Sequence, residues 1–102
     1  MSFPVDIDDI IKALSNPARR EILGWLKEPE ANFSAQEYPL ENGVCVGRIF
    51  ERAGLSQSTV SAHMAVLQRA GLVTSTRIGQ WVFYRRDEAT IREFLKRMKT
   101  EL

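Results

Sequence analysis

Residues 55–72 read LSQSTVSAHMAVLQRAGL and predict one helix with a defined start, a defined end and two unlike faces. Ser56 suits the N-cap position, because its hydroxyl can accept from the free N–H groups of the first helical turn. Gly71 suits the end of the helix, where a residue in the left-handed conformation is common. At about 100° per residue, three apolar side chains share the face that we expect to point at the core: Val60, Met64 and Leu67.

The opposite face of this helix carries almost no bulk and no acidic side chain. It is formed by Ser58, Ala62, Ala65 and Arg69. A helix face that is merely solvated normally carries several Glu and Lys residues. A slim face with small polar groups at its N-terminal end is what a helix needs to enter the major groove of DNA. The pattern therefore indicates a recognition helix.

The segment before residues 55–72 supplies the first half of a motif. Residues 44–46, Val-Cys-Val, predict a brief strand, and residues 47–53 predict a short helix. A tight turn at Gly54 joins this helix to the recognition helix. Two helices joined through a glycine-containing turn form a helix-turn-helix.

The segment after residues 55–72 changes to a strand pattern. Residues 73–77 and 81–85 are rich in β-branched and aromatic side chains, and the glycine between them predicts a hairpin with a two- or three-residue loop. A hairpin directly after a recognition helix is a wing, and Arg77 and Gln80 are the candidates for its tip. We expect three aromatic side chains to belong to the core of the wing sheet: Trp81, Phe83 and Tyr84.

Two further helices are predicted before the motif. An apolar stripe at helical spacing covers residues 7–14, and Asn16-Pro17 then supplies the cap and first residue of a helix that runs to about residue 27. Residues 28–45 contain two prolines and an Asn-Gly turn, which predict a long loop.

The two terminal helices predict an interface between copies of the chain. Asp87 is a suitable cap for a last helix over residues 88–102, and both this helix and the first one carry an apolar stripe. The stripes either pack on their own domain or pair with a second copy. We predict a homodimer, because a chain of 102 residues gains core by dimerising and two recognition helices can then span adjacent half-sites. The predicted interface consists of Ile7, Ile10, Ile11, Leu14, Ile91, Phe94, Leu95 and Met98.

The composition indicates one ordinary globular domain over residues 1–102, with 44% hydrophobic and 26% charged residues. The predicted class is mainly α, with about five helices and a wing sheet of two or three strands. No apolar run approaches about 18 residues, which argues against a membrane span. The first nine residues show no leader and the chain has a single cysteine, so we expect a cytoplasmic protein.

The net charge of +1 conceals an uneven distribution. Residues 1–45 carry a net charge of −4, residues 46–86 carry +5, and residues 87–102 are balanced. The basic excess lies in the segment that holds the slim helix and the wing, as expected for a surface that binds phosphate, although chance clustering is the alternative. Arg19 and Arg20 lie in the acidic segment, and we expect them to be solvated or paired with acids of the first helix.

The stretches ALSNPARREIL, GLSQSTVSAHMAVLQRAGLV and RIGQWVFYRRD together resemble the ArsR/SmtB family of bacterial winged-helix repressors, over roughly residues 5–102. The resemblance implies a homodimer that represses transcription by binding double-stranded operator DNA and is released by an inducer, often a metal ion. It also implies that Gln57, Ser58, Ser61 and His63 approach the DNA. The helical wheel places His63 at the edge of the buried face, which favours a packing or backbone contact over base reading.

The predicted DNA-binding surface combines the start and outward face of the recognition helix with the wing tip. It consists of Ser56, Gln57, Ser58, Thr59, Ser61, Ala62, His63, Arg69, Arg77 and Gln80. Many members of the family carry a larger polar or basic residue at the position of Ala62, which leaves the DNA sequence that is read open.

The metal site of the family is not expected here. The metal sensors of the family often carry two cysteines at the position where this chain reads Cys-Val-Gly from Cys45. A thiolate metal site needs three or four ligands, and this chain offers one cysteine and one histidine. The last helix carries three glutamates but no histidine. We therefore predict no metal site and no cofactor. Cys45 remains a candidate redox residue near Arg48, and a buried structural thiol is the alternative.

The leading hypothesis is a homodimeric repressor that binds an imperfect inverted repeat and is released by an inducer. One alternative is a repressor that senses oxidants through Cys45, and another is a winged helix that binds proteins and not DNA. Acids or large apolar side chains on the outward helix face would favour the protein-binding module, and neither is present. An enzyme is not expected, because the sequence has no phosphate loop, no paired Ser/His/Asp set and no metal cage. The inducer is open: a small molecule, an oxidant, a partner protein or none.

Overall fold

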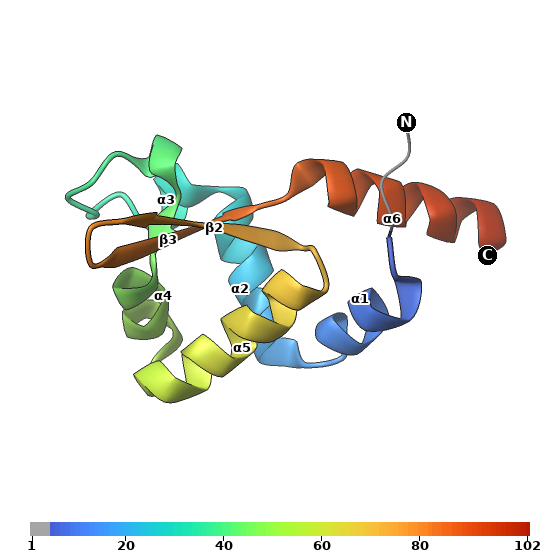
Figure 1. Ribbon diagram of the computed structural model, residues 1–102, viewed down its shortest axis with the longest axis horizontal. Coiled ribbons are helices and arrows are strands. Elements are labelled where there is room, and N and C mark those ends of the chain that lie inside the picture. Colours follow the sequence, from blue (N-terminus) through green and yellow to red (C-terminus); the bar gives the residue numbers. More distant parts are fainter. Residues whose placement is uncertain (1–4) are drawn as a thin grey trace.

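The computed structural model describes residues 5–102. Residues 1–4, which belong to the segment in which no leader is predicted, lie outside the described residues. The described chain forms a mainly helical winged helix-turn-helix with a small sheet, as the sequence predicts (Figure 1). In chain order the elements are α1 (Ile7–Leu14), α2 (Pro17–Lys27), α3 (Pro29–Asn32), the 3-10 helix η1 (Leu40–Asn42), β1 (Val44–Cys45), α4 (Val46–Ala53), α5 (Gln57–Arg69), β2 (Val73–Ile78), β3 (Trp81–Arg86) and α6 (Glu88–Glu101). Across residues 5–102, no helix combines the length and the apolar character that a membrane span requires.

Helix α5 begins and ends where the sequence predicts. The Ser56 hydroxyl accepts from the Thr59 N–H at 3.2 Å, and Gly71 takes a left-handed conformation with a φ of 81°. The Leu72 N–H then donates to the Leu67 carbonyl at 3.0 Å, which satisfies a free carbonyl of the last turn. The core-facing stripe is confirmed, because three side chains have no exposed surface: Val60, Met64 and Leu67.

Helices α1, α2 and α4 pack against α5 and enclose the core with it (Figure 1). Asn16 caps α2, where its Oδ1 accepts from the Ala18 N–H at 2.8 Å, and Pro17 follows as the first residue. The buried residues of this core come from the helices α1, α2, α4, α5 and α6, and from the inner face of the sheet, whereas the short helices α3 and η1 contribute none. The buried stripe of α5 thereby fixes which of its sides faces solvent.

Helix α6 extends away from this core and lies above α1 in the view of Figure 1. Its cap is as predicted, since Asp87 Oδ1 accepts from the Thr90 N–H at 3.1 Å. Two residues predicted for the dimer interface, Ile10 and Phe94, are instead covered by their own chain, with exposed fractions of 0% and 9%. Ile10 has no surface left for a partner and Phe94 has little, and both belong to the core of their own chain.

The sheet is antiparallel with the strand order β1-β3-β2. Ile78 pairs with Trp81, so the wing turn is the two-residue loop Gly79-Gln80, and this settles the register that the sequence left open. On the other edge, Cys45 pairs with Phe83 and joins the start of α4 to the wing. The wing is therefore attached to both helices of the motif.

The two faces of the sheet bury different aromatic side chains. Tyr84 lies on the inner face and packs against the main core. Phe83 lies on the outer face and is 1% exposed, because the Tyr38 ring covers it edge-on at a centroid distance of 5.6 Å. Trp81 is 42% exposed near the wing turn, so the prediction that it belongs to the sheet core is wrong.

The segment of residues 28–45 is more ordered than the predicted loop. It contains α3 and η1, and Asn32 at the end of α3 donates from its Nδ2 to the carbonyls of Trp25 at 3.1 Å and Glu28 at 3.0 Å. These bonds satisfy carbonyls at the end of α2. A helix of four residues is too short to produce an apolar repeat, which explains why the sequence pattern did not reveal it.

Gly43 lies directly before β1, where the backbone passes close to Tyr84 of β3, and a substitution there tests this close approach. Its φ is 106°, and a Cβ there would lie 2.8 Å from the Tyr84 carbonyl oxygen. We expect Gly43→Ala to lower the free energy of unfolding by about 3 kcal/mol, measured by urea denaturation. Gly79→Ala is the control, because its φ of 64° is also left-handed but no atom lies within 4 Å of the new Cβ; we expect it to cost about 1 kcal/mol. Equal costs would exclude the close approach as the cause.

Candidate nucleic-acid interface

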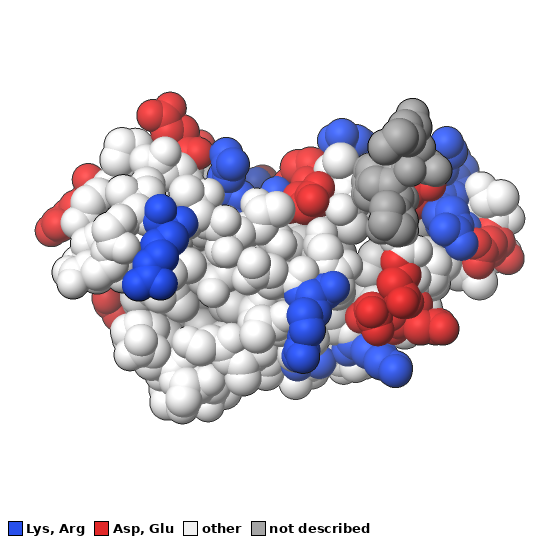
Figure 2. Space-filling view, in the orientation of Figure 1, with Lys and Arg blue, Asp and Glu red and all other residues white. Residues whose placement is uncertain are grey.

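The start of α5 presents a cluster of small polar side chains. The Ser56 hydroxyl donates to Thr59 Oγ1 at 2.9 Å and lies 3.2 Å from the Ser58 hydroxyl. All three residues are exposed, as are Gln57 and Ser61. On the face drawn in Figure 2, the N-terminal half of α5 carries no charged side chain. The positive end of the helix dipole thus lies under a slim, uncharged surface that approaching phosphates and base edges can contact.

The outward face of α5 is exposed along its whole length, with Ala62 and Ala65 in the middle and Arg69 at the end. The side chain of Arg69 forms no ion pair within residues 5–102. Basic side chains also lie over the wing in Figure 2, on the other side of the uncharged surface. The slim helix is therefore flanked by positive charge.

The wing contributes Arg77 and Gln80. Gln80 lies in the turn itself, as predicted, whereas Arg77 pairs with Val82 one step back from the last pair. Its Nε donates to the Gly79 carbonyl at 3.2 Å, which holds the guanidinium beside the turn. Arg77 therefore still reaches the tip, through its side chain.

Most arginines of the basic segment are already engaged. Arg48 and Arg86 form ion pairs with Glu51 at 3.2 Å and Glu88 at 2.9 Å. Arg52 stacks over the Trp25 ring, with 4.9 Å between the guanidinium carbon and the ring centroid. Another arginine, Arg85, donates to the Glu41 carbonyl at 3.2 Å. Of the six arginines in residues 46–86, only Arg69 and Arg77 lack a carboxylate, aromatic or distant carbonyl partner in the described part of the chain, so the net charge of +5 overstates the charge available to phosphate.

His63 is half-buried at the edge of the core face, as the wheel predicts, and contacts a residue that sequence reasoning missed. Arg19 in α2 places its Nη1 3.2 Å from His63 Nδ1. Both arginines donate to backbone carbonyls at the end of α1: Arg19 to those of Ala13 and Lys12, and Arg20 to that of Leu14. Arg20 is exposed, as the solvated alternative predicts, whereas the prediction is wrong for Arg19, which is half-buried and pairs with no acid among the described residues. The sequence did contain a signal for these contacts, because a basic residue about one turn beyond the end of a helix can donate to the last carbonyls of that helix.

A second feature lies at the outer face of the sheet. A cavity of about 240 Å³ is lined by Gln36, Glu37, Tyr38, Cys45, Gly47, Arg48, Glu51 and Trp81. Gln36 builds its wall, because its side chain donates to the carbonyl of Tyr38 at 3.1 Å and accepts from the Cys45 N–H at 2.9 Å. Sequence reasoning missed the cavity, since its wall comes from a segment without periodicity.

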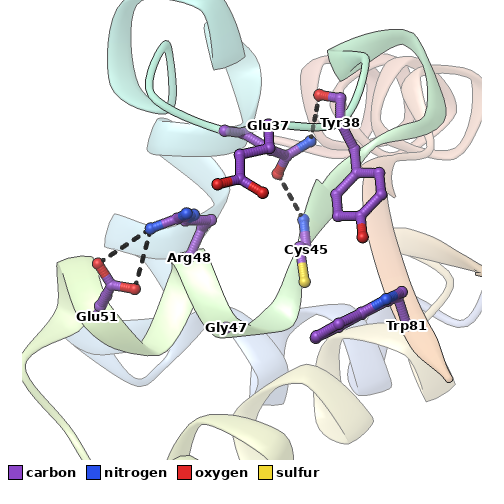
Figure 3. A pocket seen from close by; sticks show the side chains of 8 residues that line it. Glu37, Tyr38, Cys45, Gly47, Arg48, Glu51 and Trp81 are labelled. Carbon is purple, nitrogen blue, oxygen red and sulfur yellow. Dashed lines mark hydrogen bonds and ion pairs between the residues drawn. The ribbon is translucent and has the colours of Figure 1, made fainter.

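Cys45 is 8% exposed, and its sulfur points toward Gly47 and Trp81 in Figure 3. Arg48 does not approach that sulfur, since its guanidinium points at the Glu51 carboxylate instead (Figure 3). The expected help from Arg48 in stabilising a thiolate is therefore not seen. Within residues 5–102, no three His, Cys, Asp or Glu side chains come close enough together to hold a metal ion.

The chain is similar to known DNA-binding regulators. Residues 40–75, which span the helix-turn-helix, match the model of the arsR family of bacterial regulatory proteins. The uncharacterized HTH-type transcriptional regulator YbzH of Bacillus subtilis is 43% identical over 96 residues, which cover 92% of this chain and 96% of YbzH. The transcriptional activator HlyU of Vibrio cholerae is 37% identical over 75 residues, covering 74% of this chain and 57% of HlyU.

Solved structures agree with these matches. The structure of reduced HlyU superposes with a TM-score of 0.60 at 34% identity and covers 88% of this chain and 84% of that chain. The homodimeric winged helix-turn-helix DNA-binding domain of Mb0332 from Mycobacterium bovis, a possible ArsR-family regulator, superposes with a TM-score of 0.65 at 26% identity and covers 92% of this chain and 76% of that one. From its helix-turn-helix, its wing and its likeness to these regulators over nearly the whole described fold, this chain belongs to the ArsR family of DNA-binding transcriptional regulators.

Proposed function

We propose that the chain is a cytoplasmic homodimeric repressor that binds an imperfect inverted repeat in double-stranded DNA and leaves it when an inducer binds. The observation that carries the proposal is the slim, exposed face of α5, with Arg69 at its C-terminal end and Arg77 on the neighbouring wing; neither arginine has a carboxylate partner in the described chain. A winged-helix dimer that covers a promoter excludes polymerase by occupancy, which needs no further surface.

Different side chains would carry affinity and specificity. Arg69 and Arg77 would contact phosphates on either side of the groove and set the register, because phosphate contacts position a protein but carry no sequence information. The first turn of α5 would reach base edges. There the side-chain amide of Gln57 could accept from N6 of adenine and donate to its N7. The small side chains of Ser58 and Ala62 would allow this close approach.

The proposed dimer forms through α1 and α6. Two large apolar side chains are exposed on these helices: Ile11 on α1 at 48% and Leu95 on α6 at 58%. Helix α6 also extends away from the core of its own chain (Figure 1). The remaining members of the proposed interface are partly buried: Ile7, Leu14, Ile91 and Met98. The Mb0332 domain is homodimeric, which supports a homodimer for this chain. A two-fold dimer would present two α5 helices to successive major grooves, which accounts for an inverted repeat.

The second candidate is a repressor that senses oxidants through Cys45. In its favour, the sulfur faces a cavity at the junction of α4 and the wing. Peroxide would oxidise the thiolate to a sulfenic acid, in which an S–O bond forms, the O–O bond breaks and hydroxide leaves. With one cysteine in the sequence, any later disulfide would need a thiol from another molecule.

A charge placed on the outward face of α5 tests DNA binding. We expect Ala62→Glu to weaken binding to a DNA fragment selected from a random library by at least tenfold, because the carboxylate would face phosphates. Fluorescence anisotropy over a range of salt concentrations measures the dissociation constant and its salt dependence. Ala89→Glu adds the same charge at an exposed position in the first turn of α6 and should bind as the wild type does. No DNA selected by the wild type, or binding without salt dependence, would favour a protein-binding module.

Dimerisation has its own test. We expect Leu95→Glu to raise the dissociation constant of the dimer by at least tenfold, because it removes an apolar side chain and buries a charge at the interface. Analytical ultracentrifugation measures this constant, and Ala89→Glu again serves as the charge-matched control. A wild-type chain that stays monomeric at micromolar concentration would contradict the proposed assembly.

The oxidant hypothesis makes a separate prediction. Hydrogen peroxide should release the wild-type chain from the selected DNA and leave Cys45→Ser and Cys45→Ala bound. Gel-shift assays with and without peroxide measure the release, and addition of a thiol reductant should restore binding. Release of the wild type and of both variants to the same extent would rule Cys45 out as the sensor.

A further inference from the structure

One guanidinium connects the first helix of the chain with the recognition helix. Arg19 donates from Nε to the Ala13 carbonyl at 2.7 Å and from Nη2 to the Lys12 carbonyl at 3.2 Å, and its Nη1 lies 3.2 Å from His63 Nδ1. Both partners on α1 are carbonyls in the last turn of that helix, where carbonyls lack helical partners, and the Lys12 carbonyl also accepts from Ser15. The guanidinium is therefore held by contacts on two helices besides its own.

The contact determines which nitrogen of His63 carries the proton. Arginine has donors and no acceptor, so a hydrogen bond between Arg19 and His63 requires Nδ1 to accept. In the neutral imidazole the proton then resides on Nε2, which becomes the only donor of the ring. A proton on Nδ1 would face the guanidinium N–H and leave no hydrogen bond between the two side chains.

We propose that Arg19 is a positioning residue for DNA binding, which holds His63 in the neutral Nε2–H tautomer so that this N–H donates to a phosphate of the bound DNA. The assignment of a phosphate rests on the proposed function, whereas the tautomer concerns the free protein alone. His63 lies about two turns beyond Ser56 and at the edge of the outward face. Base edges are read by the first turn of a recognition helix, so a half-buried side chain beyond it faces the backbone that flanks the groove.

Arg20 provides a natural control for Arg19. It is the next residue of α2 and also donates to a carbonyl at the end of α1, that of Leu14, but within residues 5–102 it forms no hydrogen bond with His63. Loss of either arginine removes one positive charge and hydrogen bonds to the end of α1, two for Arg19 and one for Arg20. The contact with the imidazole is what distinguishes them.

The tautomer is measured in the free protein, without DNA. His63 is the only histidine of the chain, so its ring nitrogens give one unambiguous pair of signals in a long-range ¹H–¹⁵N NMR spectrum. Above neutral pH, we expect an unprotonated Nδ1 and a protonated Nε2 in the wild type and in Arg20→Met. In Arg19→Met both signals should move toward the average of the two tautomers. A protonated Nδ1 in the wild type would overturn the proposal.

The consequence for DNA binding is measured on the selected DNA fragment by fluorescence anisotropy. We expect Arg19→Met to weaken binding about tenfold more than Arg20→Met, the effect of losing one hydrogen bond to a charged group. Arg19→Lys should restore part of this loss, because an ammonium can still donate to Nδ1. Equal losses for Arg19→Met and Arg20→Met would show that only the support of α1 or the charge matters.

A substitution at His63 completes the test even if Arg19→Met is poorly folded. In His63→Asn the side-chain oxygen can still accept from Arg19, but the ring N–H is lost, so we expect a tenfold loss of DNA affinity at unchanged thermal stability. In the Arg19→Met background the same change should cost little more, since the two residues act as one unit. Additive losses would contradict the proposal. Absence of DNA binding by the wild type would instead refute the proposed function and leave the tautomer measurement standing.

Discussion

Burial of the apolar stripe of α5 is the constraint on which the exposed side of this protein depends. Val60, Met64 and Leu67 have no exposed surface, and each such side chain contributes roughly 1.5–3 kcal/mol when it leaves water. A helix rotated by even one residue would expose part of this stripe. The core therefore sets the rotation of α5 about its axis, and with it the side chains that can enter a groove. The fold does not depend on the side chains of the slim face, so these residues can vary with the sequence that is recognised.

The sequence predicted the elements that have strong local signals. Ser56, Asn16 and Asp87 cap their helices with the expected hydrogen bonds, because an N-cap is decided by neighbours three residues apart or fewer. What failed depends on contacts between distant segments. Trp81 is a large aromatic residue of the kind that is often buried, but it lies next to the wing turn, where the Tyr38 ring at a centroid distance of 6.2 Å leaves it 42% exposed. The link from Arg19 to His63 joins residues 44 positions apart, which no local pattern can indicate.

The distribution of charge shows the same limit. Sequence counting finds an excess of +5 in residues 46–86, but counting cannot tell a free guanidinium from one that is already bound. In the fold, Arg48 and Arg86 neutralise carboxylates, and Arg52 lies over an aromatic ring. Arg69 at the end of α5 and Arg77 on the wing remain. The arginines divide into those that build the motif and those that stay available, and only the three-dimensional contacts make that division.

The two-residue turn of the wing has a consequence for how such regulators can diversify. Its strands form an antiparallel ladder that is anchored at one end by β1 and α4 and open at the other. Each residue added to both strands would lengthen the hairpin by about 3.3 Å without disturbing the anchored end. Additions in even steps preserve the face on which each side chain lies, whereas a single step exchanges the faces. The reach of the wing can thus vary in evolution independently of the core.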